Sequence, residues 1–235
     1  MNKLSLFHSA VATMSAVAVC SCAGAQVTVG GTGTSNVFPF SRNYSGQYQQ
    51  VYSSSAFSGP VSIGSVAFES VAPGGSGAYS FTGTLGLAST TLTPAMPGTS
   101  YLATTQVFSG TQTATLTASG SAFDLIFNLA TPFTYDPATG NLLLNVTTNS
   151  VSDPLPFAAF VFGSSTNVGR TFNFSGNGAP FAGADEGLLT RFGVTPATAT
   201  PEFGTVFSLG GLLAAGGTGL WVNSRRRKNS RTVRT

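Results

Sequence analysis

Between residues 48 and 194 the chain consists of short segments in which apolar residues alternate with serine and threonine. Glycine, proline or asparagine interrupts this series about every ten residues, and a period of two with Thr, Val, Phe and Tyr is typical of antiparallel strands. We therefore expect an all-β fold of about ten strands, with no helix before residue 201. The expected strands cover residues 48–52, 61–68, 79–82, 101–108, 113–117, 123–129, 142–146, 157–162, 171–174 and 188–194.

The turns between these segments predict how the strands are connected. The segment 136–141, Asp-Pro-Ala-Thr-Gly-Asn, combines the residues that a tight turn requires, so it is the strongest hairpin signal. The segments 73–77 and 94–98 predict longer loops at which the chain changes sheet. Without crossover helices, such an order favours a two-sheet antiparallel β-sandwich of jelly-roll type over residues 26–196.

The composition suits a sandwich with a neutral surface. The 19 phenylalanines supply a core that has no polar group to satisfy. Serine and threonine take the outward positions that Lys and Glu usually occupy. The glycine-rich and threonine-rich residues 26–40 are expected to begin as a loose N-terminal segment that settles near Phe38.

The N-terminus reads as a secretory signal covering residues 1–25. Lys3 is followed by an apolar stretch over residues 4–19, and Ala23 and Ala25 occupy the −3 and −1 positions of a cleavage site before Gln26. An uncleaved membrane anchor and lipid attachment at Cys22 are the alternatives.

Both cysteines, Cys20 and Cys22, and the single histidine, His8, lie within this signal. The mature chain would contain neither residue type. That excludes disulfides, thiolate or imidazole metal sites, and catalysis by a Cys or His nucleophile or base.

Charge is segregated along the chain. Residues 26–200 carry three arginines and six acidic residues, a net charge of −3, although the whole chain has +3. The expected domain therefore has no basic surface for phosphates, and we expect no nucleic-acid partner.

Any catalysis would have to rest on carboxylates. Glu69 with Glu186, or Asp124 with Asp185, are the pairs that a glycoside hydrolase would need in one cleft. Nothing in their spacing brings either pair together, so we predict no catalytic residue and no enzyme.

Oxygen ligands for Ca²⁺ are present in Asp185-Glu186-Gly187, with Asp153 or Asp136 as a further donor. The acidic residues do not recur at alternate positions as they do in a dedicated calcium loop. We therefore expect a polar loop with no metal or cofactor.

Four tyrosines are candidates for stacking on sugar rings: Tyr44, Tyr48, Tyr52 and Tyr135. Tyr48 and Tyr52 share strand parity and point to the same face, so they are the predicted sugar contacts. The alternative is that they pack in the core.

The C-terminus reads as a membrane anchor. Residues 197–202 form a linker that ends in a Pro-Glu motif, residues 203–224 are uncharged and largely apolar, and residues 225–235 are basic. A helix over 203–224 just crosses a hydrocarbon core of about 30 Å. The positive charges keep the tail in the cytoplasm and the domain outside.

This three-part ending resembles the PEP-CTERM sorting signal of exported bacterial proteins. Phe203 departs from the signal by replacing its second proline. The matching positions are Pro201, Glu202, Gly204 and Thr205, followed by Arg225, Arg226, Arg227 and Lys228. The resemblance implies export, membrane insertion, processing near Pro201-Glu202 by an exosortase, and association with exopolysaccharide or biofilm material.

Together these features predict an exported, surface-anchored protein with a structural or matrix role. A carbohydrate-binding module of the same fold is the alternative. A carboxylate-dependent glycoside hydrolase is the third hypothesis.

Overall fold

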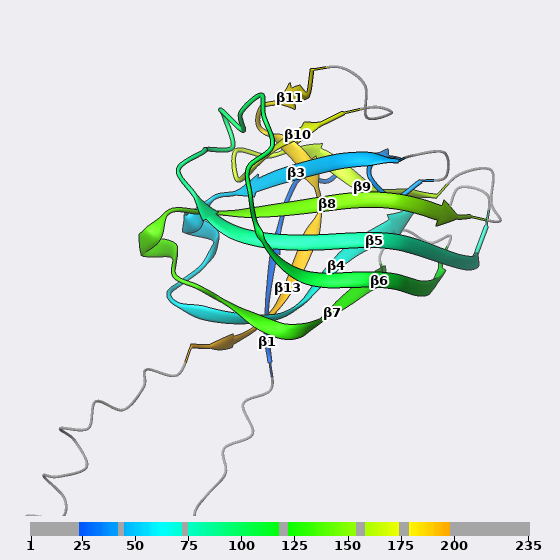
Figure 1. Ribbon diagram of the computed structural model, residues 1–235, viewed down its shortest axis with the longest axis horizontal. Helices are drawn as coiled ribbons and strands as arrows, with labels where there is room; N and C mark the ends of the chain where they lie inside the picture. Colours follow the sequence, from blue (N-terminus) through cyan, green and yellow to red (C-terminus); the bar gives the residue numbers. More distant parts are fainter. Residues whose placement is uncertain are drawn as a thin grey trace, which may run out of the picture.

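The computed structural model describes residues 24–41, 45–71, 75–117, 122–153, 158–173 and 179–197. These residues form two antiparallel β-sheets that pack face to face (Figure 1). Within these ranges the regular elements are strands and two short 3₁₀ turns, η1 (Ser54–Ala56) and η2 (Pro137–Thr139). The predicted all-β class with two antiparallel sheets is confirmed.

The two sheets have different strand orders. The first sheet runs β1 (Ala25–Val29), β13 (Thr190–Pro196), β4 (Val61–Val71), β9 (Ala159–Ser164), β12 (Glu186–Leu188), with β2 (Thr34–Asn36) paired to β9 and β7 (Ala122–Tyr135) paired to β4. The second sheet runs β11 (Phe181–Gly183), β10 (Val168–Phe172), β3 (Gly46–Tyr52), β8 (Asn141–Ser152), β5 (Gly77–Thr90), β6 (Thr105–Leu116).

The turn at 136–141 has the predicted chemistry but a different role. Asp136 Oδ1 accepts a hydrogen bond from Ala138 N at 2.9 Å, and Gly140 has a φ of 132°. However, β7 lies in the first sheet and β8 in the second, so the predicted hairpin is wrong. The turn instead carries the chain from one sheet to the other. The prediction failed because the residues of a turn determine that the chain reverses, but not which strand the next strand pairs with.

The two longer loops have different outcomes. The prediction for the segment 73–77 is correct, since β4 and β5 lie in different sheets. The prediction for the segment 94–98 is wrong, because β5 and β6 are neighbours in the second sheet. Residues 91–104 form one long loop, called here the rim loop, that folds back over β3 and β10 instead of crossing.

The N-terminal residues of the domain are also more ordered than expected. β1 begins at Ala25 and pairs along β13, from Ala25 with Val194 to Val29 with Thr190. The edge of β13 supplies the hydrogen-bond partners of β1. Because β13 is far away in the sequence, the composition of the N-terminal residues does not reveal this pairing. As a result the two ends of the described chain leave the sandwich on the same side (Figure 1).

Phenylalanine rings lie at the centre of the core, packed together with leucine, valine and buried tyrosine side chains. The buried ring of Phe40 lies at its centre, with ring centroids of Phe68 at 4.6 Å, Phe160 at 5.2 Å and Phe81 at 5.4 Å. Phe68 and Phe160 belong to the first sheet and Phe81 to the second, so Phe40 contacts both layers.

Replacing Phe40 with alanine should therefore destabilise the fold by about 3–5 kcal/mol, because the cavity lies where both sheets meet. Phe181→Ala is the matched control, since that ring is 59% exposed, and it should cost less than about 1 kcal/mol. Urea unfolding of both variants measures the difference. Equal losses of stability would contradict the central position of Phe40.

Candidate functional site

The predicted sugar contacts Tyr48 and Tyr52 lie in the core. They share a face of β3, as their parity predicts, but their exposed fractions are 1% and 0%, and Tyr135 is also buried. No sugar reaches these rings, so the prediction of an exposed row is wrong and the core alternative holds. Tyr44 lies outside the described residues.

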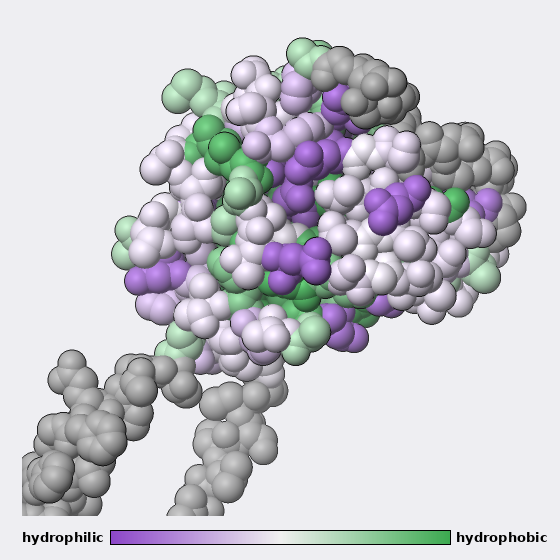
Figure 2. Space-filling model, viewed as in Figure 1, coloured by the Kyte–Doolittle hydropathy of each residue, from purple (hydrophilic) through white to green (hydrophobic). Residues whose placement is uncertain are grey.

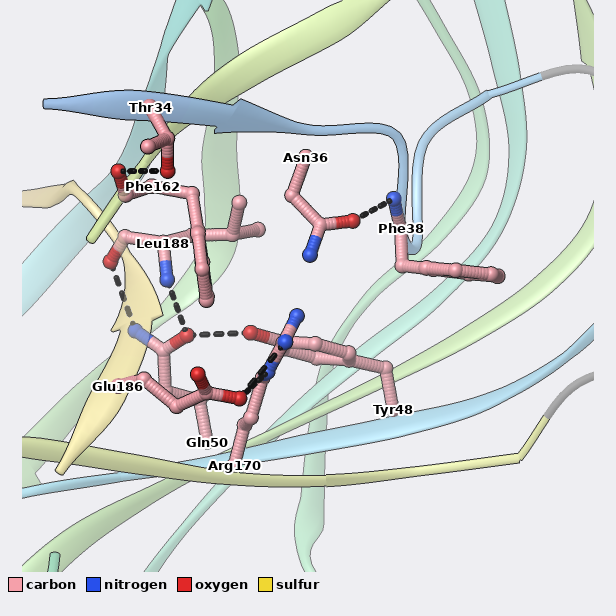
Figure 3. Close-up of polar contacts among 9 residues, drawn as sticks. All are labelled: Thr34, Asn36, Phe38, Tyr48, Gln50, Phe162, Arg170, Glu186 and Leu188. Atoms are coloured by element: carbon pink, nitrogen blue, oxygen red, sulfur yellow. Dashed lines mark hydrogen bonds and ion pairs between the residues drawn. The ribbon is translucent and has the colours of Figure 1, made fainter. Parts of the chain in front are cut away.

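The phenol groups of Tyr48 and Tyr52 are tolerated in the core because they join a buried polar network around Gln50. Gln50 Nε2 donates to Leu188 O at 2.9 Å, and Leu188 N donates to Gln50 Oε1 at 2.8 Å (Figure 3). Tyr48 Oη donates to the same Oε1, and Tyr52 Oη donates to Thr190 Oγ1 at 2.8 Å. Gln50 comes from the second sheet and Leu188 from the first, so this network joins the layers.

A second polar contact between the sheets is the ion pair of Arg170 and Glu186. Arg170 Nη2 and Nε donate to Glu186 Oε1 at 2.8 and 3.0 Å. The guanidinium carbon also lies 4.1 Å from the ring centre of Phe162 and 4.6 Å from that of Phe172. The Arg170 side chain is only 8% exposed and that of Glu186 is 30% exposed, so the ion pair is a partly buried link between β10 and β12.

Two of the carboxylates considered for catalysis or calcium, Glu186 and Asp124, have structural partners. Glu186 is bound to Arg170, and Asp124 Oδ2 accepts from Ser70 Oγ at 2.7 Å and Thr117 N at 2.8 Å. Within the described ranges no group of three Asp, Glu, His or Cys gathers to hold a metal ion. Neither candidate pair, Glu69 with Glu186 nor Asp124 with Asp185, lines the groove described next.

The rim loop is fixed to the outer face of the second sheet. Leu102 N donates to Gln49 Oε1 at 3.0 Å, and Gln49 Nε2 donates back to Leu102 O at 2.6 Å. Thr171 Oγ1 adds a bond to Gly98 O at 2.9 Å. These bonds hold the loop over β3 and β10.

A groove of about 570 Å³ lies beside this loop. Its lining residues are Gly46, Gln47, Thr99, Ser100, Tyr101, Asn173 and Pro180. Tyr101 Oη donates to Gln47 O at 2.7 Å, which fixes the ring, and burial raises the pKa of Tyr101 to about 12. An aromatic ring beside amides and hydroxyls is suited to an uncharged polar ligand such as a sugar.

Sequence reasoning missed Tyr101 because it placed this residue at the start of a strand. The strand β6 begins only at Thr105. Pro94, Pro97 and Gly98 just upstream were a signal that the loop extends further, since they indicate a chain still changing direction.

The predicted targeting residues fall at the edges of the described chain. Ala25 and Gln26 lie in β1, opposite Val194 and Gly193. Ala23, the sorting residues from Pro201 to Lys228 and the apolar segment 203–224 lie outside the described residues. Over the described ranges, no helix has the length and apolar character to cross a membrane.

Comparisons with family models, with curated proteins and with solved structures find no match for this chain.

The buried tyrosines predict an alkaline limit of stability. Burial raises the pKa of Tyr48, Tyr52 and Tyr79 well above the ordinary value. Unfolding lets these phenols ionise near pH 10, so above about pH 10 the native state binds more protons than the unfolded state.

The free energy of unfolding should accordingly fall above about pH 10, by about 1.4 kcal/mol per pH unit for each of the three phenols. Below that pH they contribute no slope. Urea midpoints at pH 9 and pH 11, together with tyrosinate absorbance, measure this effect. Equal midpoints at the two pH values would contradict it.

Proposed function

We propose that this chain is an exported protein anchored at the cell surface, where its β-sandwich has a structural or matrix role without catalysis. The signal at residues 1–25 directs export, the segment 203–224 inserts as a transmembrane helix, and an exosortase recognises the PEP-CTERM-like ending. The observation that carries this proposal is the three-part C-terminal sequence, joined to a domain whose two ends leave on one side (Figure 1).

The proposed domain is a jelly roll. The strand orders support this proposal. β2-β9-β4-β7 in the first sheet and β3-β8-β5-β6 in the second interleave eight successive strands as two Greek keys do. β1, β10, β11, β12 and β13 extend the two sheets. Such a fold is stable without disulfides, which suits an exported chain whose cysteines lie in the signal.

The geometry also suits display. β10, β11 and the rim loop lie on the side of the sandwich away from the two chain ends (Figure 1). A linker at 197–202 would therefore hold the anchor on one side and present the Tyr101 groove on the other. Exopolysaccharide or biofilm material is the proposed surrounding of that exposed side.

The second candidate function is a carbohydrate-binding module. The groove of about 570 Å³ beside Tyr101 favours it, because the groove combines an aromatic ring with the amide of Gln47 and the hydroxyls of Thr99 and Ser100. This role is compatible with anchoring, and affinity for sugars would distinguish it from a purely structural role.

Peptide mapping of the surface form tests the proposed function. The full chain, expressed in an exosortase-containing host, should yield a mature form that begins at Gln26 and lacks peptides beyond about residue 202. Glu202→Ala should leave the tail attached in the membrane fraction, whereas Thr200→Ala, the matched control outside the motif, should be processed normally. A full-length chain in the cytoplasm would overturn the proposal.

A further inference from the structure

The outer face of the second sheet carries a regular array of hydroxyl groups. The ladder register places Ser80 opposite both Thr113 and Ser152, Thr82 opposite Thr111 and Ser150, and Thr84 opposite Ser109 and Thr147. Each row therefore has one hydroxyl on β6, one on β5 and one on β8. We call these nine residues the hydroxyl lattice: Ser80, Thr82, Thr84, Ser109, Thr111, Thr113, Thr147, Ser150 and Ser152.

The lattice faces outward. Its neighbours in sequence, Tyr79, Phe81 and Leu85 on β5, point inward and are at most 3% exposed. Five of the nine are exposed: Ser109, Thr111, Thr113, Ser150 and Ser152. The other four are half-buried. Adjacent strands separate hydroxyls by about 4.8 Å within a row, and successive rows lie about 7 Å apart.

This face also lacks charge. The sequences of β5, β6 and β8 contain no Asp, Glu, Lys or Arg. The strands of the first sheet, in contrast, carry Glu69, Asp124, Glu186 and Arg191. Figure 2 shows much of the area over β5, β6 and β8 as pale, with separate strongly hydrophilic patches.

β6 is the edge strand of the second sheet, and β7 of the first sheet packs beside it, with Phe108 and Phe127 in contact. Among the described strands β6 pairs only with β5, and such edges are usually protected by lysine or proline. This edge has no such charge, and the outer face beside it carries nine hydroxyl groups. We therefore expect a ligand that neutral hydroxyl groups would bind.

The lattice is continuous with the Tyr101 groove. Thr147 pairs across β8 and β3 with Gln47, and Gln47 lines the groove and accepts the Tyr101 hydroxyl through its carbonyl. A second open groove, of about 590 Å³, lies over the other end of the lattice beside Ser80, Thr113 and Ser152. The hydroxyl lattice therefore has one groove over the row of Ser80 and another beside the row of Thr84.

We propose that the hydroxyl lattice binds an extended, uncharged polysaccharide chain that lies across β6, β5 and β8 and ends in the Tyr101 groove. This inference deepens the proposed matrix role and rests on it for its biological setting. The ligand is assigned by chemistry. A repeating polymer of neutral hydroxyls matches a repeating neutral array, whereas an anionic polymer finds no cation on β5, β6 or β8.

A neutral hydroxyl surface predicts how binding depends on the length of the polysaccharide and on the salt concentration. Each hydrogen bond exchanged with water contributes only about 0.5–1.5 kcal/mol, so short oligosaccharides bind weakly and long chains bind through many contacts. Because no charge takes part, binding is insensitive to salt.

Affinity electrophoresis of the full chain in nonionic detergent tests this proposal. Gels contain dextran or hydroxyethylcellulose as neutral probes and alginate as an anionic probe. The wild-type chain should be retarded by a neutral polymer, equally at low and high salt, and not by alginate. T82V/T84V/T111V should lower the affinity at least tenfold, because three hydroxyls become methyl groups while the β-branched shape stays.

The matched control is T28V/T134V/T195V, which changes three exposed threonines of the first sheet in the same way. It should bind as the wild type does, and the unfolding midpoints of both triple variants should agree. Equal binding by the lattice variant and the wild type, salt-sensitive binding to alginate alone, or no retardation by either neutral polymer would each overturn the proposal. Normal export and processing of the lattice variant separates this result from a failure of the proposed function.

Discussion

Two adjacent glutamines on β3 link the second sheet to the elements that lie on both of its faces. Gln50 faces the core and pairs through its amide with both backbone groups of Leu188 in the opposite sheet. Gln49 faces the other way and pairs in the same manner with Leu102 in the rim loop. A buried amide without partners is costly, so each side chain permits only the arrangement that satisfies it. This dipeptide therefore contributes hydrogen bonds both between the two sheets and between the second sheet and the rim loop.

The features assigned to function depend on that arrangement. The Tyr101 groove exists because the rim loop is held over β3, and the hydroxyl lattice lies on the same sheet beyond the area that the loop covers. The first sheet carries the N-terminal strand and the last strand, so the chain ends leave from it together. In the proposed role, the chain ends mark the attachment side and the uncharged hydroxyl lattice marks the side for contact. This division accounts for an unusual feature of the composition, a surface with few charges.

Sequence reasoning predicted the class of the fold well and the contacts of individual residues poorly. Period-two alternation and the phenylalanine content determine that strands form and that two sheets enclose an apolar core, since these are local properties. Strand partners are not local. The turn at Asp136 therefore looked like a hairpin, although β7 and β8 pair with different sheets. Tyr48 and Tyr52 were placed on the correct common face, but which face was buried depended on β12 and β13, more than 130 residues away. Gln49 and Gln50 gave no signal, because a glutamine in a strand usually indicates solvent.

Amide hydrogen exchange at Leu188 and Leu102 measures directly whether the two glutamines hold the sheets and the rim loop, because the glutamine side chains are the hydrogen-bond acceptors of these amides. The expected result is that Leu188 N–H exchanges as slowly as amides inside the strand ladders, and that Leu102 N–H is protected well beyond the level of a loop residue. Exchange of Leu188 and Leu102 at the rate of unstructured chain would contradict it, because the sheets and the rim loop would then be held by something other than the two glutamines.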